Sequence, residues 1–247
     1  MVVDNWLGAT RWVGVLLAAM GAAAVGPQGA DGQSVDLRVG WVNSGFNGSR
    51  IREQGGLNGA SLNVAFGFPV TSRLSLQPEL QITLKGATRR STAIGVIGSD
   101  TTFYHIADAL RLLYVEVPVL ARLELSPGRN GVRPYIAGGP YVGWLMHCFG
   151  YLNRATGSAA PSQAAGDSTS VGAACLDQGT RRLDVGLAAG AGVRVPLGSV
   201  TGLVDVRYEQ GLSNAVQNAF GEAHNHALVA GVGLSILVGR RARVHGP

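Results

Sequence analysis

Charged residues recur at every second position along several segments of this chain, and their spacing limits the chemistry they could do. Between residues 73 and 85, Arg73, Glu79 and Lys85 share one face of an expected strand, while leucines and Ile82 share the other. In a small closed barrel, the charged faces of all strands would meet in the interior. Enclosed charges each need a partner. We therefore predict a structural salt-bridge network there, with a gated polar pathway or an acid/base site as the alternative.

The predicted lumen charge network contains basic and acidic residues in equal number, six of each. Eight strands leave room for side chains but not for a wide channel, which favours a network that fills the barrel. The members are Arg73, Glu79, Lys85, Glu116, Arg122, Glu124, Arg182, Asp184, Arg194, Asp205, Arg207 and Glu209.

Other residues that could do chemistry give weaker signals. Glu79 and Glu116 could act as an acid–base pair if the fold brought them together. His224 and His226 have the spacing of two metal ligands on one strand face, and Ser213 with His226 could form a nucleophile and its base. Solvated loop histidines are far commoner than either arrangement. We therefore predict no metal site, no cofactor and no enzymatic activity.

Cys148 and Cys175 are the only cysteines, so only one intrachain pairing is possible. They flank segment 149–174, which is rich in alanine, glycine and serine. In an oxidising compartment, a disulfide between them would tie the base of this segment and stabilise the fold by about 3–4 kcal/mol. We predict this disulfide; two reduced thiols are the alternative.

The N-terminal segment has the pattern of a secretory signal. Arg11 precedes an apolar run over residues 12–25, and small residues follow through Gly29, Ala30 and Gly32. The run is shorter than the roughly 20 apolar residues that a spanning helix needs. We predict a signal peptide over residues 1–32, with a buried N-terminal helix as the alternative.

The composition points to a membrane rather than to nucleic acid. Charged residues form only 14% of the chain, against roughly 25% in ordinary soluble domains. The formal net charge is +5, but the lysines and arginines are scattered and form no basic run. We therefore predict no nucleic-acid binding, and a surface that faces anionic lipid head groups fits the charge more easily.

Apolar and polar residues alternate in about eight segments, which predicts an all-β, eight-stranded antiparallel up-and-down transmembrane β-barrel. We expect short turns near residues 69–72, 126–132 and 197–199, and long loops near 44–56, 87–107, 147–180 and 212–223. Short periplasmic turns and long extracellular loops are typical of outer-membrane barrels. A soluble lipocalin-like barrel would have the same period with apolar residues inside, but its outer wall needs more charge.

We place the barrel at residues 33–239 and a polar C-terminal tail at 240–247. The alternation leaves the facing of residues 133–146 open, because both faces there are mixed. The glycines of Gly190-Ala191-Gly192 fall on the core-facing side, and we interpret them as room for larger neighbours.

Short motifs follow one another in a fixed order from Gly59 to the last strand. They are Gly67-Phe68, Leu76-Gln77-Pro78-Glu79-Leu80, Leu113-Tyr114-Val115-Glu116-Val117-Pro118, Arg133-Pro134-Tyr135, Gly138-Gly139-Pro140, Asp184-Val185-Gly186, Arg207-Tyr208 and Gly211-Leu212-Ser213-Asn214. This order resembles the PorT-like outer-membrane β-barrel family. The resemblance implies an eight-stranded outer-membrane barrel and no single activity. The chain departs from the family by ending on a polar tail instead of a terminal aromatic residue, which bears on recognition by the barrel-assembly machinery.

We therefore expect a non-enzymatic barrel of the bacterial outer membrane, plugged by its charge network, with exposed loops for binding or adhesion. Its expected partners are outer-membrane lipid and, during biogenesis, the barrel-assembly machinery, and we expect a monomer. The alternatives are a transport or secretion accessory of PorT type, a lipid-modifying outer-membrane enzyme and a soluble periplasmic barrel.

Overall fold

The computed structural model describes residues 33–48, 54–97, 100–125, 131–157, 165–171, 181–214 and 223–238. Within these residues the chain forms nine strands: β1 (Gln33–Asn47), β2 (Gln54–Pro69), β3 (Leu74–Ile97), β4 (Asp100–Glu124), β5 (Arg133–Gly157), β6 (Ala165–Val171), β7 (Leu183–Leu197), β8 (Val200–Gly211) and β9 (His224–Val238). Among the described residues, no helix is long and apolar enough to cross a bilayer. The predicted signal peptide and C-terminal tail lie outside the described residues.

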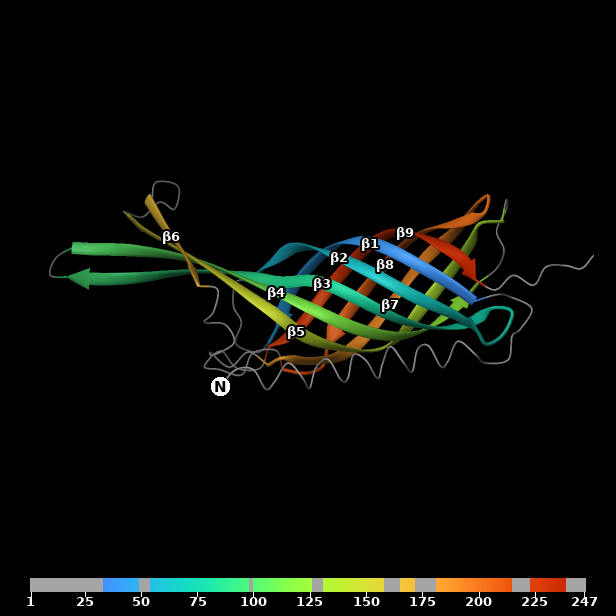
Figure 1. The fold of residues 1–247 in the computed structure, drawn as a ribbon. Coiled ribbons are helices and arrows are strands. Elements are labelled where there is room, and N and C mark those ends of the chain that lie inside the picture. Colours follow the sequence, from blue (N-terminus) through green and yellow to red (C-terminus); the bar gives the residue numbers. More distant parts are fainter. Residues whose placement is uncertain are drawn as a thin grey trace, which may run out of the picture.

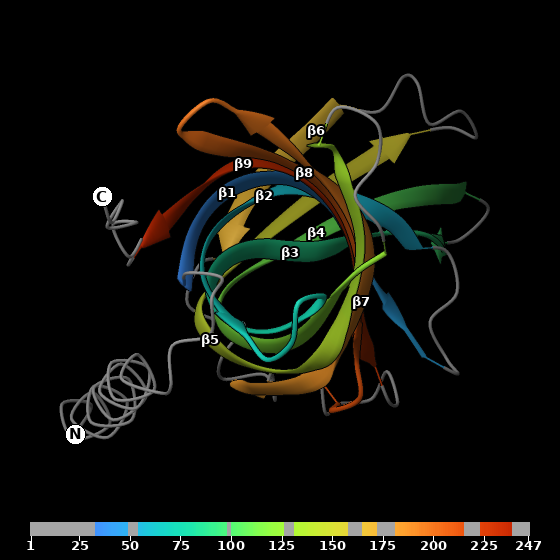
Figure 2. The ribbon, with the colours of Figure 1, turned by 90° about the vertical axis from the view of Figure 1, so that its right-hand side faces the viewer.

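Eight of the nine strands close into one antiparallel barrel (Figures 1 and 2). In the ring, β1 to β5 pair in sequence order, and β5 then pairs with β7. Strand β7 pairs with β8, and β8 pairs with β9. The first and last strands close the ring, in a register that runs from Gln33–Val238 to Asn47–His224. The ninth strand, β6, pairs only with the far end of β5. The predicted eight-stranded barrel is therefore confirmed.

The barrel is apolar outside and polar inside. In β1, Leu37 and Val39 are 53% and 54% exposed, whereas Asp36 and Arg38, which alternate with them, are buried. The same alternation holds along β8, where Val204 and Val206 face outward. A closed wall of exposed valine, leucine and isoleucine suits a hydrocarbon solvent, because the closed ring leaves no barrel strand unpaired at its edge.

The connections separate the barrel into two ends. The β2–β3 and β7–β8 turns are short; the latter uses Gly198 at φ +72°, a left-handed conformation that glycine adopts without strain. We call this end, at which β1 also begins and β9 also ends, the short-turn end. It is the end that faces the viewer in Figure 2. The opposite end is the long-loop end.

Two predicted long loops are instead extensions of the barrel strands. Residues 87–107 were expected to form a loop, but β3 and β4 stay paired as far as Ile97 and Asp100. Residues 147–180 were also expected to form a loop, but β5 continues to Gly157 and β6 pairs with it. The loop predictions were wrong there because the apolar–polar alternation fades where strands leave the bilayer, while backbone pairing continues. Figure 1 shows β3, β4, β5 and β6 projecting beyond the barrel.

The sequence left open which residues of β5 point into the barrel, and a β-bulge explains why both faces appear mixed. Tyr135, Tyr141 and Leu145 point inward, and the pairing with β4 then shifts register next to Leu113 and Tyr114. The shift adds one residue to β5, which restores an inward position at Cys148, a buried residue. Cys175 lies outside the described residues, so the disulfide stays a prediction.

Candidate functional site

The interior of the barrel gathers most of the predicted charge network. Nine of the twelve predicted residues are buried, and they come from β3, β4, β7 and β8. Glu124 lies at the short-turn rim, where its side chain is 18% exposed. The buried members are Glu79, Lys85, Glu116, Arg122, Asp184, Arg194, Asp205, Arg207 and Glu209.

Two predicted members, Arg73 and Arg182, are outside the lumen. Both side chains are exposed, and each residue lies one position before its strand begins, at Leu74 and Leu183. The alternation of apolar and polar residues in the sequence includes Arg73 and Arg182, but the barrel wall begins one residue later in each case. A side chain outside the wall is solvated and needs no interior partner.

The network also contains two charges that the sequence reasoning missed, Asp36 and Arg38 of β1. A signal was present in the sequence, because Asp36 and Arg38 alternate with the apolar residues Leu37 and Val39 and so share the opposite face of the strand. Uncharged polar side chains complete the interior, and their amide and hydroxyl groups carry no charge pattern that could have revealed them. They include Asn63, Gln77, Gln81, Tyr114, Tyr135, Tyr141, Asn225 and Ser235.

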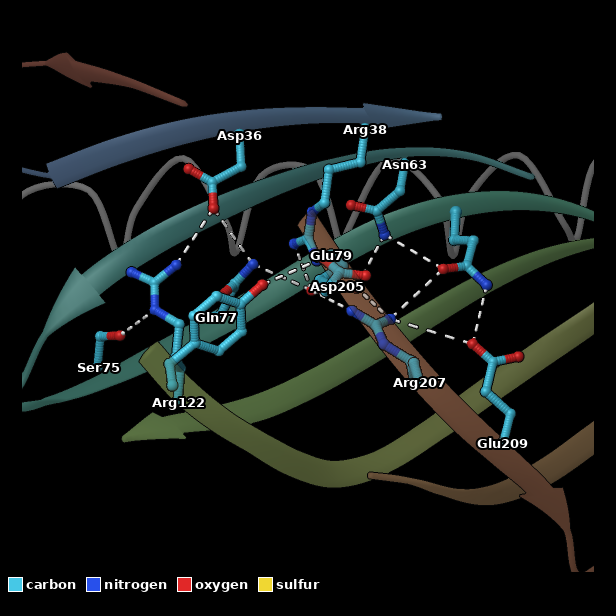
Figure 3. A network of polar contacts seen from close by, with 12 residues as sticks. Asp36, Arg38, Asn63, Ser75, Gln77, Glu79, Arg122, Asp205, Arg207 and Glu209 are labelled. Carbon is cyan, nitrogen blue, oxygen red and sulfur yellow. Dashed lines mark hydrogen bonds and ion pairs between the residues drawn. The ribbon is translucent and has the colours of Figure 1, made fainter. Parts of the chain in front are cut away.

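The central cluster is built around Glu79 (Figure 3). Its carboxylate accepts hydrogen bonds from Arg207 at 2.7 and 3.0 Å and from Arg38 at 2.8 Å. Asn63 and Gln77 donate to the same carboxylate at 2.8 and 3.1 Å. Arg38 also pairs with Asp205 at 3.1 Å. Two guanidinium groups thus face two carboxylates across the barrel, so this level has no net charge.

The long-loop cluster is built around Lys85. Its ammonium group lies 2.6 Å from Glu116 and 2.8 Å from Glu209, and 5.0 Å from the ring centroid of Tyr141. Gln81 donates to both carboxylates at 3.0 Å. A buried ammonium held between two carboxylates and an aromatic face is well compensated.

At the long-loop end, Asp184 forms no ion pair with any described residue and is held by neutral donors. Asn225 donates to it at 3.0 Å, Ser213 at 2.9 Å and Tyr141 at 3.3 Å. The Ser213 hydroxyl is thus bound to a carboxylate and is not paired with His226.

The short-turn cluster holds the remaining ion pairs. Arg122 pairs with Asp36 at 3.2 Å, and Arg194 pairs with Glu124 at 3.3 Å. Ser75 accepts from Arg122 and Ser235 accepts from Arg194, each at 3.1 Å.

Glycines on the inner wall make room for this network, as predicted for Gly190 and Gly192. A Cβ atom built on Gly192 would lie 2.6 Å from the Tyr135 ring, and one built on Gly233 would lie 2.5 Å from the Arg38 side chain. The glycines therefore let long polar side chains cross a narrow barrel.

The three clusters follow one another along the barrel and leave little open space at its centre. The cavity beside Arg38, Glu79 and Arg207 has a volume of about 10 Å³, which is room for roughly one water molecule. Glu79 and Glu116, the conceivable acid–base pair, belong to separate clusters and bind separate cations. The arrangement is that of an interior ion-pair core.

The closed antiparallel ring, apolar outside and charged inside, defines a transmembrane β-barrel. The family model described as outer membrane protein beta-barrel domain matches residues 32–217. The chain belongs to this family and is a protein of the bacterial outer membrane. No curated protein sequence matches the chain.

The chain is similar to several solved outer-membrane barrels. The attachment invasion locus protein Ail of Yersinia pestis is 14% identical, with 83% of this chain and 99% of Ail covered and a TM-score of 0.39. Neisserial surface protein A is 13% identical, with 85% of this chain and 100% of that protein covered and a TM-score of 0.43. OprG of Pseudomonas aeruginosa is 10% identical, with 85% of this chain and 98% of OprG covered and a TM-score of 0.41.

Proposed function

We propose that this protein is a non-enzymatic outer-membrane anchor, whose plugged barrel holds a projecting sheet for binding or adhesion outside the cell. The observation that carries the proposal is the contrast between its two parts. Paired charges fill the lumen. Strands β3, β4 and β5, in contrast, extend beyond the barrel, where β6 pairs with β5 (Figure 1). A filled lumen suits an anchor better than a pore.

The projecting sheet has features of a binding surface. In the register of the structure, β2 pairs with β3 only as far as Arg89, so the β3 edge beyond this residue is not paired with β2. Exposed strand edges offer backbone donors and acceptors to a partner chain. Outer-membrane barrels carry their long connections outside the cell, so this sheet would face the surroundings.

Shortening the projecting hairpin is expected to abolish binding and to leave the barrel folded. Arg89 and Asp108 are paired across the hairpin, so an Asn-Gly turn can join them in place of residues 90–107. Bacteria that display this variant should attach to cultured host cells no better than bacteria that lack the protein. The measurement is the number of attached bacteria at equal amounts of folded barrel, judged by heat-modifiable gel migration.

A control variant changes the opposite end by the substitutions Thr71→Asn and Ser72→Gly in the β2–β3 turn. It should attach as the unchanged protein does. If the shortened hairpin attached equally well, the projecting sheet would not be the binding surface, and the proposal would have to be abandoned.

We also propose that the protein is inserted by the barrel-assembly machinery and lies in outer-membrane lipid as a monomer. The PorT-like assignment rests on the order of motifs, two of which supply Glu79 and Glu116 to the network. A secretion defect after deletion of the gene would support a PorT-type accessory role in place of adhesion.

A further inference from the structure

The short-turn end of the barrel opens into a cavity of about 400 Å³. Among the described residues, four arginines line it, Arg73, Arg122, Arg133 and Arg194, together with one carboxylate, that of Glu124. This volume lies within the range of pockets that hold small molecules. Figure 2 shows the end of the barrel at which the cavity opens.

The positive charge in this cavity exceeds the negative charge that could neutralise it. Glu124 is shared between Arg194 at 3.3 Å and Arg133 at 3.5 Å. Asp36, behind the wall of the cavity, pairs with Arg122. Four guanidinium groups therefore meet two carboxylates, which leaves a surplus of two positive charges. A concave low-dielectric wall strengthens the attraction of such a surplus for anions.

Two of the arginines have donors to spare. In the part of the chain that the structure describes, the Arg73 side chain makes no ion pair or hydrogen bond. The Arg133 side chain is 57% exposed and has only the long contact with Glu124. A guanidinium group has five N–H donors and binds oxyanions in a bidentate manner, so both side chains can take a further acceptor.

Backbone features hold these arginines in place. The Thr71 hydroxyl accepts hydrogen bonds from the backbone N–H groups of Arg73 and Leu74 at 3.3 and 3.0 Å. Gly131 has φ +77°, and a Cβ atom on it would lie 3.2 Å from Pro196, so the chain just before β5 approaches the end of β7 closely. The cavity is thus lined by residues of the β2–β3 turn and by the adjacent ends of β4, β5 and β7.

We propose that this arginine cavity binds a phosphate group at the periplasmic mouth of the barrel. Short turns of outer-membrane barrels face the periplasm, so the phosphate would arrive from that side. Free phosphate compounds and the head groups of anionic phospholipids offer the same chemistry. The Arg73 and Arg133 guanidinium groups would bind its oxygens, and Arg122 and Arg194 would supply positive charge behind them.

The first test is calorimetric titration of the folded full chain with inorganic pyrophosphate, in zwitterionic detergent at low ionic strength. Saturable binding is expected, and the double variant Arg73→Ser, Arg133→Ser should bind at least about tenfold more weakly, because two charge-assisted sets of hydrogen bonds are lost. Both side chains lie outside the ion-pair core, so the variant should show the same heat-modifiable migration as the unchanged protein.

The second test distinguishes the lipid source. The protein in nanodiscs of mixed phosphatidylglycerol and phosphatidylcholine should retain phosphatidylglycerol selectively in native mass spectra if the head group is the ligand. The double variant should lose this selectivity. Pyrophosphate binding without lipid selectivity would identify a free phosphate compound.

The matched control is Arg182→Ser, which removes an exposed arginine from the long-loop end. It should bind as the unchanged protein does in both tests. The proposal is overturned if neither pyrophosphate nor phosphatidylglycerol binds selectively, or if Arg182→Ser weakens binding as much as the double variant does.

Discussion

Replacing Glu79 with glutamine is expected to lower the free energy of unfolding of the barrel by about 3–5 kcal/mol, the cost of breaking a buried ion pair by removing one partner. Glutamine keeps the shape of the side chain but removes its charge and turns an amide N–H₂ toward guanidinium donors. Arg38 would keep Asp205 at 3.1 Å. Among the described residues, Glu209 at 4.0 Å would then be the only carboxylate within ion-pair distance of Arg207, so the Arg207 charge would be left buried and poorly paired.

Urea unfolding of the refolded barrel in detergent micelles measures this effect. Trp41 and Trp144 lie on the outer wall, where their fluorescence reports loss of the barrel. The control is Glu124→Gln at the short-turn rim, where partial exposure should limit the loss to about 1 kcal/mol. Equal losses in the two variants would mean that Glu79 is not the centre of the core.

Replacing Lys85 with methionine should destabilise the long-loop cluster by a similar amount, again about 3–5 kcal/mol. Methionine fills much of the same space, so the loss would come from charge. Glu116 would have no cation within reach of an ion pair among the described residues, and Glu209 would keep only Arg207 at 4.0 Å. The same urea titration measures the effect.

A triple variant separates charge from packing at this position. Lys85→Met together with Glu116→Gln and Glu209→Gln removes the cation and both carboxylates at once, and neutral replacement of a whole buried ion cluster is often tolerated. We expect the triple variant to recover most of the stability lost in Lys85→Met. A triple variant as unstable as the single one would show that Lys85 contributes by packing and not by neutralising the two carboxylates.

The sequence allowed the barrel and most of its interior to be predicted, because one repeating pattern encodes both. In a closed antiparallel sheet, alternate residues point to opposite sides. Apolar residues such as Leu37 and Val39 therefore mark positions on the outer wall, and charged residues such as Asp205 and Arg207 mark positions in the lumen. The pattern fails at strand ends. Arg73 and Arg182 continue the alternation by one position after the wall has ended, and both are solvated.

The rest of the fold could not be predicted because it depends on pairing between distant strands. The projecting parts of β3, β4 and β5 are held together by backbone hydrogen bonds. Such bonds do not depend on the type of side chain, so the sequence carries no pattern that would reveal them. The bulge in β5 appears only when its register against β4 is known. The assignment of carboxylates to cations, with Glu79 bound to Arg38 and Arg207 and Glu116 bound to Lys85, also depends on the three-dimensional arrangement of the strands.

Conductance of the purified full chain in planar lipid bilayers tests whether paired charges seal the lumen. A sealed lumen should give no stepwise channel openings in molar potassium chloride, under conditions in which a porin in the same bilayer conducts. Sustained openings from barrels that are shown to be folded by their heat-modifiable migration would contradict it, because ions can cross only if a continuous water path passes the side chains of Glu79, Arg207 and Lys85.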